Sequence, residues 1–439
     1  MTMEVRKGEK LAYAVGDMGL CLMLDVVYQF QLFFFTDVIG LGAAIAGGVV
    51  FFARAAGSLF DVPAGLLADR TRTRFGRFRP WVAGAAIPLA VMFALVYFSP
   101  PGGEWVKASY AAATLAVFML LVSLQNTPYS ALGGVMSASE HVRASIASWR
   151  VVGALAGGTV VSVCTLPLAE FFGAWGGVER GWLLTSLVYA VLALPLMLVS
   201  GIFPRERVEP ASRERVPVRA ALPAVLRTPG AKAVLFAGVA HSLAGGFSSN
   251  GFVYYFKYVA DGCSIGYPTY GFVSQAATAC AVLFLTARVT RRFAAVRVAS
   301  AAYAGAALLS CVYFFLPASS AASLLAVCAV RCVVYAPAIA LFWTLLARVA
   351  DTSGGMATAL VFGLACFLNK TASAAGSSLF GCGLSLAGFV PASEAHAAES
   401  SFYTVLFIRI SISFIPAMFM LLASLLVHSV EKQGECQEE

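Results

Sequence analysis

Long apolar segments separated by short polar loops dominate this sequence. Windows of about 20 apolar residues, the length that spans a bilayer as a helix, recur about twelve times. The expected spans run over 11–37, 42–68, 80–99, 108–135, 145–168, 181–203, 231–259, 267–287, 298–317, 320–349, 357–381 and 401–428. The pattern predicts an all-α membrane protein with twelve transmembrane helices.

The longest polar interval, 204–230, divides these spans into two sets of six. Similar segments recur in the two sets: LFFFTDVIG and YYFKYVADG close the first and seventh spans, and TRTRFGRFRP and TRRFAAVRV follow the second and eighth. Paired bundles of this kind place a solute site near the midplane and work by alternating access. We therefore predict two pseudo-symmetric six-helix bundles, with the first bundle at 1–203, a cytoplasmic linker at 204–230, the second bundle at 231–428 and a cytoplasmic tail at 429–439.

Composition and charge support a membrane location. Only 12% of residues are charged, 60% are hydrophobic and the mean hydropathy is +0.82, which leaves too little polar surface for a soluble globule. Arginines gather in alternate loops, so the positive-inside rule predicts that both termini are cytoplasmic, in the plasma (inner) membrane. The net charge of +8 then reflects contact with anionic lipid headgroups rather than nucleic acid.

Several function classes lack their motifs here. No P-loop, zinc-ligand cluster or nucleophile elbow is present, so we expect no enzyme activity and no cofactor. Most of the ten cysteines lie inside spans and show no metal-ligand spacing, while pairing of Cys263 with Cys382 stays open. Two repeated bundles with buried charges favour a carrier over a channel or scaffold.

Several sequence blocks, taken together, resemble a known transporter family. The segment GLLADRTRTRFGRFRPW resembles the loop between the second and third helices of the major facilitator superfamily, and its Asp69 and Arg70 are expected to have a gating or structural role. The blocks YQFQLFFFTDVIGL, FGRFRPW, NTPYSAL and ALFWTLLARVADT follow in the order of the glycoside–pentoside–hexuronide:cation symporters. The resemblance covers nearly the whole chain and implies the major facilitator fold.

The first span carries a polar stripe. Asp17, Cys21 and Asp25 recur at i, i+4 and i+8, and Tyr28 continues this face. The resemblance places Cys21 where the melibiose carrier of that family has a sugar-binding aspartate, so Asp25, one turn away, is expected to compensate in a solute site with Tyr28. In the alternative, Asp17 caps or pairs near the cytoplasmic end and Asp25 meets an arginine.

On the second span, Arg54, Gly57 and Asp61 share a face. The resemblance makes Asp61 the second of two cation-site acids and puts Gly57 at the first. Sodium prefers several oxygen ligands, so a lone acid leaves Na+ and H+ both open as coupling ions, with Na+ at Asp61 the one metal expected. In the alternative, Arg54 and Asp61 form a purely structural pair.

In the fourth span, Ser123, Asn126 and Ser130 line one face, and Pro128 frees a backbone carbonyl. The resemblance matches Asn126 to a second sugar-binding aspartate and Ser123 to a cation-contacting threonine. The amide of Asn126 still donates and accepts hydrogen bonds, so it can hold a hydroxyl, with Ser130 beside it. Interhelical hydrogen bonding is the alternative for this set.

Three more residues match the family's solute site: Arg150 in SIASWRVVGALAGG, Lys370 and Trp343. The tryptophan is suited to stacking on a sugar ring, and packing is its alternative. Two deep cations require negative charge, supplied either by Asp25 and Asp61 or by an anionic solute.

These observations predict a secondary active transporter that couples a cation, H+ or Na+, to symport of a sugar or glycoside. Because two carboxylates are replaced while two cations remain, the first alternative is an anionic or amphiphilic solute such as a hexuronide or a lysophospholipid. The second alternative is a membrane sensor without transport. The expected partners are a small-molecule solute and the lipid bilayer, and the expected oligomeric state is a monomer.

Overall fold

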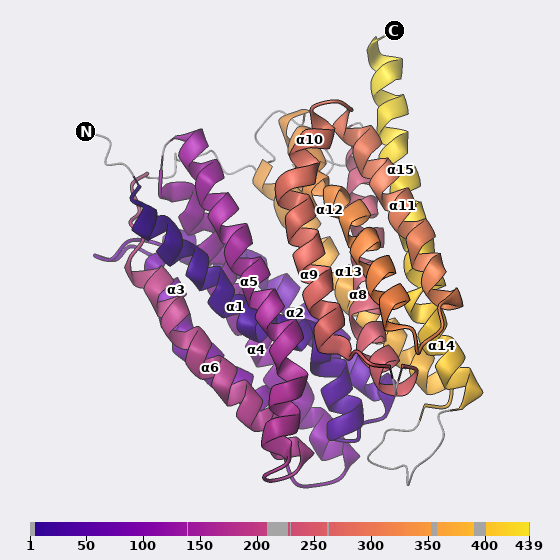
Figure 1. Ribbon diagram of the computed structural model, residues 1–439. Coiled ribbons are helices and arrows are strands. Elements are labelled where there is room, and N and C mark those ends of the chain that lie inside the picture. The colour runs from indigo at the N-terminus through magenta and orange to yellow at the C-terminus, as the bar shows by residue number, and fades with distance from the viewer. Residues whose placement is uncertain are drawn as a thin grey trace. The chain divides into compact units, whose positions relative to one another are not determined.

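The computed structural model describes residues 5–137, 139–208, 227–228, 230–260, 263–352, 358–389 and 401–438, and in these ranges the regular structure is entirely helical. The chain divides into two compact units, residues 1–213 and 214–439, coloured from indigo to magenta and from pink to yellow in Figure 1.

The N-terminal unit contains six long helices. Their bounds are α1 Lys7–Phe33, continued by the π-helix η1 Phe34–Val38, α2 Ala43–Arg70, α3 Arg79–Val96, α4 Glu104–Val135, α5 Glu140–Gly173 and α6 Val178–Ile202. The fifth helix extends beyond the predicted 145–168 at both ends. All six positions expected for spans in this half are helical.

The C-terminal unit repeats this order with more interruptions. Its helices are α8 Ala231–Tyr258, α9 Tyr267–Cys280, the π-helix η2 Ala281–Leu285, α10 Thr286–Thr290, α11 Ala295–Phe315, α12 Ala321–Thr352, α13 Thr358–Leu386, α14 Phe402–Ile412 and α15 Phe414–Glu438. Within the described residues, ten helical stretches are long and apolar enough to cross a membrane, and the more polar α8 and α13 are outside that set.

The expected span 401–428 is present as one apolar stretch, Phe402–Val430, but its helix is interrupted at one residue. The break lies at Ser413, whose backbone has φ −114° and ψ −84°. Three residues later comes Pro416, which has no N–H to donate to the carbonyl of Ile412 and whose ring crowds that carbonyl. The local sequence therefore accounts for the separation of α14 from α15.

Helices α1 and α5 cross in close contact through glycines. A methyl group on Gly157 would lie 2.8 Å from Cys21 Cβ and 2.9 Å from the carbonyl oxygen of Met18, and one on Gly153 would collide with the carbonyl oxygen of Ala14. Only glycine permits this approach of two backbones. The crossing fixes which residues of α5 face which residues of α1.

The same close approach recurs in the C-terminal unit between α8 and α13, which correspond to the first and fifth expected spans of that half. A methyl group on Gly376 would lie 2.6 Å from the carbonyl oxygen of Leu243, and one on Gly246 would collide with the carbonyl oxygen of Ser373. The equivalent helix pairs of both units therefore pack through small residues, in agreement with the internal repeat seen in the sequence.

The basic segment after α2 is organised by Glu206, which follows α6. The carboxylate of Glu206 accepts hydrogen bonds from the backbone N–H groups of Arg77 (2.9 Å), Phe78 (2.9 Å) and Arg79 (3.2 Å) at the start of α3. Between α2 and α3, Gly76 has φ +109°, which favours glycine. Among the predicted gating residues, Arg70 is exposed at the end of α2, and the side chain of Asp69 is outside the described residues.

Candidate functional site

Arg150 on α5 gathers polar groups from two other helices. Its Nη1 donates to Ser130 Oγ (3.0 Å) and its Nη2 to Asn126 Oδ1 (3.3 Å) on α4, while its Nε lies 3.2 Å from Asp17 Oδ1 on α1. Its guanidinium carbon also lies 5.0 Å from the ring centre of Tyr129. Three of the predicted solute-site residues, Asn126, Ser130 and Arg150, are thus brought together.

The sequence explains this meeting. Arg150 precedes Gly153 by three residues, so both share one face of α5, and the glycine crossing presses that face against α1. Below the cluster, the rings of Tyr13 and Tyr129 stack with centres 4.4 Å apart and planes 11° apart. Each phenol donates to the backbone carbonyl of the other tyrosine, which fixes the register of α1 against α4.

Asp17 is the partner that sequence reasoning did not assign to the site. Its side chain is 9% exposed and that of Arg150 is 30% exposed, so the pair is shielded from water on the side of the acid. The position of Asp17 in the stripe with Cys21 and Asp25 was a signal, but helical spacing cannot identify a partner on another helix. The pairing gives Arg150 a carboxylate partner other than Asp25 and Asp61, the two acids that the sequence offered as one alternative.

The rest of the predicted stripe on α1 lies beyond this pair. Cys21 packs at the crossing with Gly157 and is half-buried. Asp25 is half-buried one turn further, and its carboxylate has no hydrogen bond or ion pair within the described residues. Tyr28, half-buried, lies under Arg54, whose guanidinium carbon is 4.4 Å from its ring centre. The stripe therefore offers a thiol, a carboxylate and an aromatic ring on one helix.

Arg54 is anchored between α2 and α1. It is 3% exposed, and its Nη2 donates to the carbonyl oxygen of Val27 (2.8 Å). Its own carbonyl accepts a hydrogen bond from Ser58 Oγ (3.0 Å). Together with the stacking on Tyr28, these contacts connect α2 to α1 at Arg54.

Two of the predicted cation residues, Gly57 on α2 and Ser123 on α4, are in contact. Ser123 is 1% exposed, and its Oγ donates to the carbonyl oxygen of Gly57 (2.8 Å). A methyl group on Gly57 would lie 2.8 Å from Met119 Cβ, so these helices leave no room for a side chain at position 57. Asp61 is half-buried one turn after Gly57. The tight packing around Gly57 therefore explains why Asp61 is the one acid among the predicted cation residues.

In the C-terminal unit, Trp343 lies on α12 and Lys370 on α13. The Trp343 side chain is 43% exposed within its unit, and its indole is stacked with the ring of Phe362 at 6.3 Å between centres and 2° between planes. Lys370 is half-buried. Cys263 and Cys382, whose pairing the sequence left open, are both free thiols.

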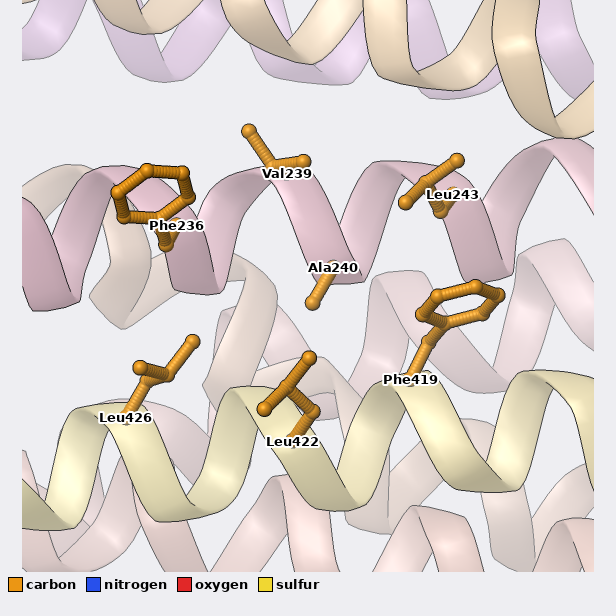
Figure 2. Close-up of a pocket in the computed structure, with 7 residues that line it drawn as sticks. All are labelled: Phe236, Val239, Ala240, Leu243, Phe419, Leu422 and Leu426. Atoms are coloured by element: carbon orange, nitrogen blue, oxygen red, sulfur yellow. The ribbon is translucent and has the colours of Figure 1, made fainter.

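An apolar pocket lies between α8 and α15. Figure 2 shows its seven lining side chains, which consist of carbon alone. They are Phe236, Val239, Ala240, Leu243, Phe419, Leu422 and Leu426. Since a sugar needs hydrogen-bond partners, this pocket does not suit a polar solute.

Residues 12–431 match the family described as MFS/sugar transport protein. The chain belongs to this family. Its fold is accordingly the major facilitator fold, and it is an integral, multi-pass membrane protein.

Three curated symporters or transporters of the same kind are similar to parts of the chain. The inner membrane symporter YicJ of Escherichia coli (strain K12) is 37% identical over 201 residues, covering 46% of this chain and 44% of the relative. The putative glycoside/cation symporter YagG of the same strain is 32% identical, covering 45% and 43%. The isoprimeverose transporter of Lactiplantibacillus pentosus is 30% identical, covering 57% and 53%. The matched segments thus span about half the length of these relatives.

Solved structures of family-like transporters agree in fold. A structure titled for substrate recognition in proton dependent oligopeptide transporters matches with a TM-score of 0.73, over 98% of this chain and 100% of that one. Its sequence identity is 13%, so the likeness concerns the fold alone.

Proposed function

We propose that this member of the MFS/sugar transport protein family is a cation-coupled symporter that takes up a sugar or glycoside by alternating access. The observation that carries the proposal is the cluster around Arg150. Asp17 balances the charge of Arg150, so the groups that remain for a solute are hydrogen-bonding ones. The printed names of YagG and the isoprimeverose transporter support the same solute class.

The chemistry of the cluster suits neutral hydroxyl groups. The oxygen of Asn126 accepts from Arg150, which leaves its NH2 group to donate to a sugar oxygen. Ser130 is exposed and Asn126 half-buried within the unit, so both are accessible to a solute. The carboxylate of Asp25 on the neighbouring stripe can accept from two hydroxyls, the function that Cys21 cannot perform.

For the coupling ion we propose a proton carried by Asp61. A sodium site needs several oxygen ligands, preferably charged. Packing against Met119 excludes an acid at position 57, which leaves Asp61 as the one carboxylate of the set that the sequence predicts for the cation. One carboxylate is enough to bind a proton, but it supplies too few oxygen ligands to bind sodium well.

The anionic-solute alternative rests on Lys370 and Arg150. Pairing with Asp17 removes Arg150 from this argument, so the neutral sugar is the stronger candidate. We further propose a location in the plasma (inner) membrane with both termini cytoplasmic, a linker at 204–230 between the two bundles, and a monomeric state. These follow from the arginine distribution and the repeat.

Uptake into proteoliposomes tests the proposal. With an imposed proton gradient, labelled glycosides accumulate in wild-type vesicles, Asp61→Asn abolishes accumulation, and Glu104→Gln, a carboxylate variant at the start of α4, does not. Accumulation that follows a sodium gradient and ignores pH would overturn the proton assignment. Binding without accumulation under any gradient would indicate a sensor and overturn the symport proposal.

The solute itself is found by thermal-shift screening of sugars, glycosides and hexuronides. A ligand at a hundred times its dissociation constant stabilises the protein by about 2.7 kcal/mol. Asn126→Leu, which removes the amide but not the helix, should abolish the shift caused by a true solute. A shift that persists in this variant would place the solute elsewhere.

A further inference from the structure

The membrane spans of the two halves differ in their acidic residues. The four acids of the predicted spans, Asp17, Asp25, Asp37 and Asp61, all lie in the N-terminal half. The six spans of the C-terminal half, from 231–259 to 401–428, contain no aspartate or glutamate, although they contain arginines and lysines. Any cation buried in this half must therefore be balanced by something other than a carboxylate of its own spans.

Arg331 is the most deeply buried of these cations among the described residues. It is 7% exposed and lies ten residues into α12, about 15 Å from the start of the helix at 1.5 Å per residue. Its Nε donates to Ser310 Oγ on α11 (2.9 Å). The two terminal nitrogens of its guanidinium make no hydrogen bond within the described part of the unit, and they keep some accessible surface.

The groups that face Arg331 include no carboxylate within the described residues. Its ionisable neighbours there are Tyr270 on α9, Tyr313 on α11, and Cys328, Cys332 and Tyr335 on α12. The phenol oxygens of Tyr270 and Tyr313 lie 3.3 Å apart, so one of their two protons joins them and the other remains for a further acceptor. A guanidinium with two unused nitrogens and a phenol proton nearby thus form a set of donors without an acceptor.

Burying a cation without a negatively charged partner is energetically unfavourable. A charged side chain at the centre of a membrane is unfavourable even on permissive insertion scales, and buried charges are retained where a partner compensates them. Arg150 shows the usual solution in this chain, a pair with Asp17. For Arg331 the fitting partner is an external acceptor of negative charge.

We propose that Arg331 and the Tyr270–Tyr313 pair form a binding site for a small monovalent anion of the size of chloride, inside the C-terminal unit. The anion accepts from the terminal guanidinium nitrogens and from one phenol, and it neutralises the cation. The same donors could receive the acidic group of a solute, so the test separates a free halide from a solute acid. The proposal does not depend on the solute or coupling ion proposed above.

Thermal unfolding of the purified full-length protein in detergent tests this site. Choline chloride replaces choline isethionate at constant ionic strength, which excludes sodium and general salt effects. Saturating chloride should raise the unfolding temperature by about 2–4 °C in the wild type. The shift should vanish in Arg331→Gln and fall in Tyr313→Phe.

Matched variants keep the result interpretable. Arg409→Gln removes another arginine of a C-terminal span, one that contacts the carbonyl of Phe314 (3.5 Å), and it should keep the full chloride response. If Arg331→Gln does not fold, Tyr313→Phe and Arg331→Lys, which keeps the charge but loses the paired nitrogens, give the same comparison.

Two outcomes overturn the proposal. A chloride response that is absent from the wild type means that protein groups such as the Cys332 thiol balance Arg331. A response only to glucuronate, lost in Arg331→Gln, assigns the site to the acid of a solute instead of a free halide.

Discussion

Replacing Asp17 by asparagine should uncouple Arg150 from α1 while leaving its contacts to α4. Arg150 Nε lies 3.2 Å from Asp17 Oδ1, and its other nitrogens are bound by Ser130 and Asn126. The neutral amide still accepts a hydrogen bond but no longer balances the guanidinium. We expect loss of stability and, through the looser Arg150, weaker solute binding.

The size of the effect follows from exposure. Two unit charges about 4 Å apart interact by about 4 kcal/mol at an effective dielectric constant of about 20. Because the Arg150 side chain is 30% exposed, water screens part of this energy. We therefore expect Asp17→Asn to lower the free energy of unfolding by about 1–3 kcal/mol.

A double-mutant cycle isolates the pair. Unfolding of wild type, Asp17→Asn, Arg150→Gln and the double variant should give a coupling energy of about 1–2 kcal/mol. The control cycle uses Asp25→Asn, since Asp25 lies two turns further along α1 and has no hydrogen bond or ion pair with Arg150. If the two cycles give the same coupling, the contact between Asp17 and Arg150 is not energetically important and the assignment of the cluster fails.

Three further changes test separate parts of the fold. Glu206→Gln should lower the free energy of unfolding by about 1–2 kcal/mol, because three backbone N–H groups lose their charged acceptor. In the control Glu104→Gln, the carboxylate accepts from one backbone N–H, so the loss should be under about 0.5 kcal/mol. Gly157→Ala should lower the melting temperature, because overpacking costs about 1–3 kcal/mol. In the control Gly134→Ala a methyl group meets open space, so the change should be neutral or stabilising. Equal shifts in the two variants would refute the crossing geometry. Arg54→Gln should destabilise by about 1–3 kcal/mol in denaturant titration, because a buried carbonyl of α1 loses its donor, and an unchanged midpoint would contradict this anchor.

The helices and the family could be predicted from the sequence, because both depend on patterns along the chain. Apolar length identified the spans, and ordered blocks identified the family. The break at Ser413 had a readable cause in Pro416 but was hidden by the uniform hydrophobicity of 401–428. Hydropathy measures average polarity and does not register a single missing N–H group.

The site was only partly predictable, because contacts between helices depend on register. Asn126 and Ser130 share a face of α4 by spacing alone, but their contact with Arg150 depends on how α5 crosses its neighbours. The pairing with Asp17 is set by the glycine contacts of α5 with α1, and sequence spacing within one helix cannot reveal them. Likewise, the reason for glycine at position 57 is the position of Met119 on another helix.

The glycine crossings of α1 with α5 and of α8 with α13 have a dynamic consequence. Where two backbones touch, neither helix can rotate or slide without lifting the other, so each pair should fluctuate as one cooperative block. Hydrogen–deuterium exchange should then show amide protection rising and falling together in the two members of a pair. In the N-terminal unit the block is larger than one pair, because Gly19, Gly181 and Gly201 bring the backbone of α6 equally close to α1, α5 and α3.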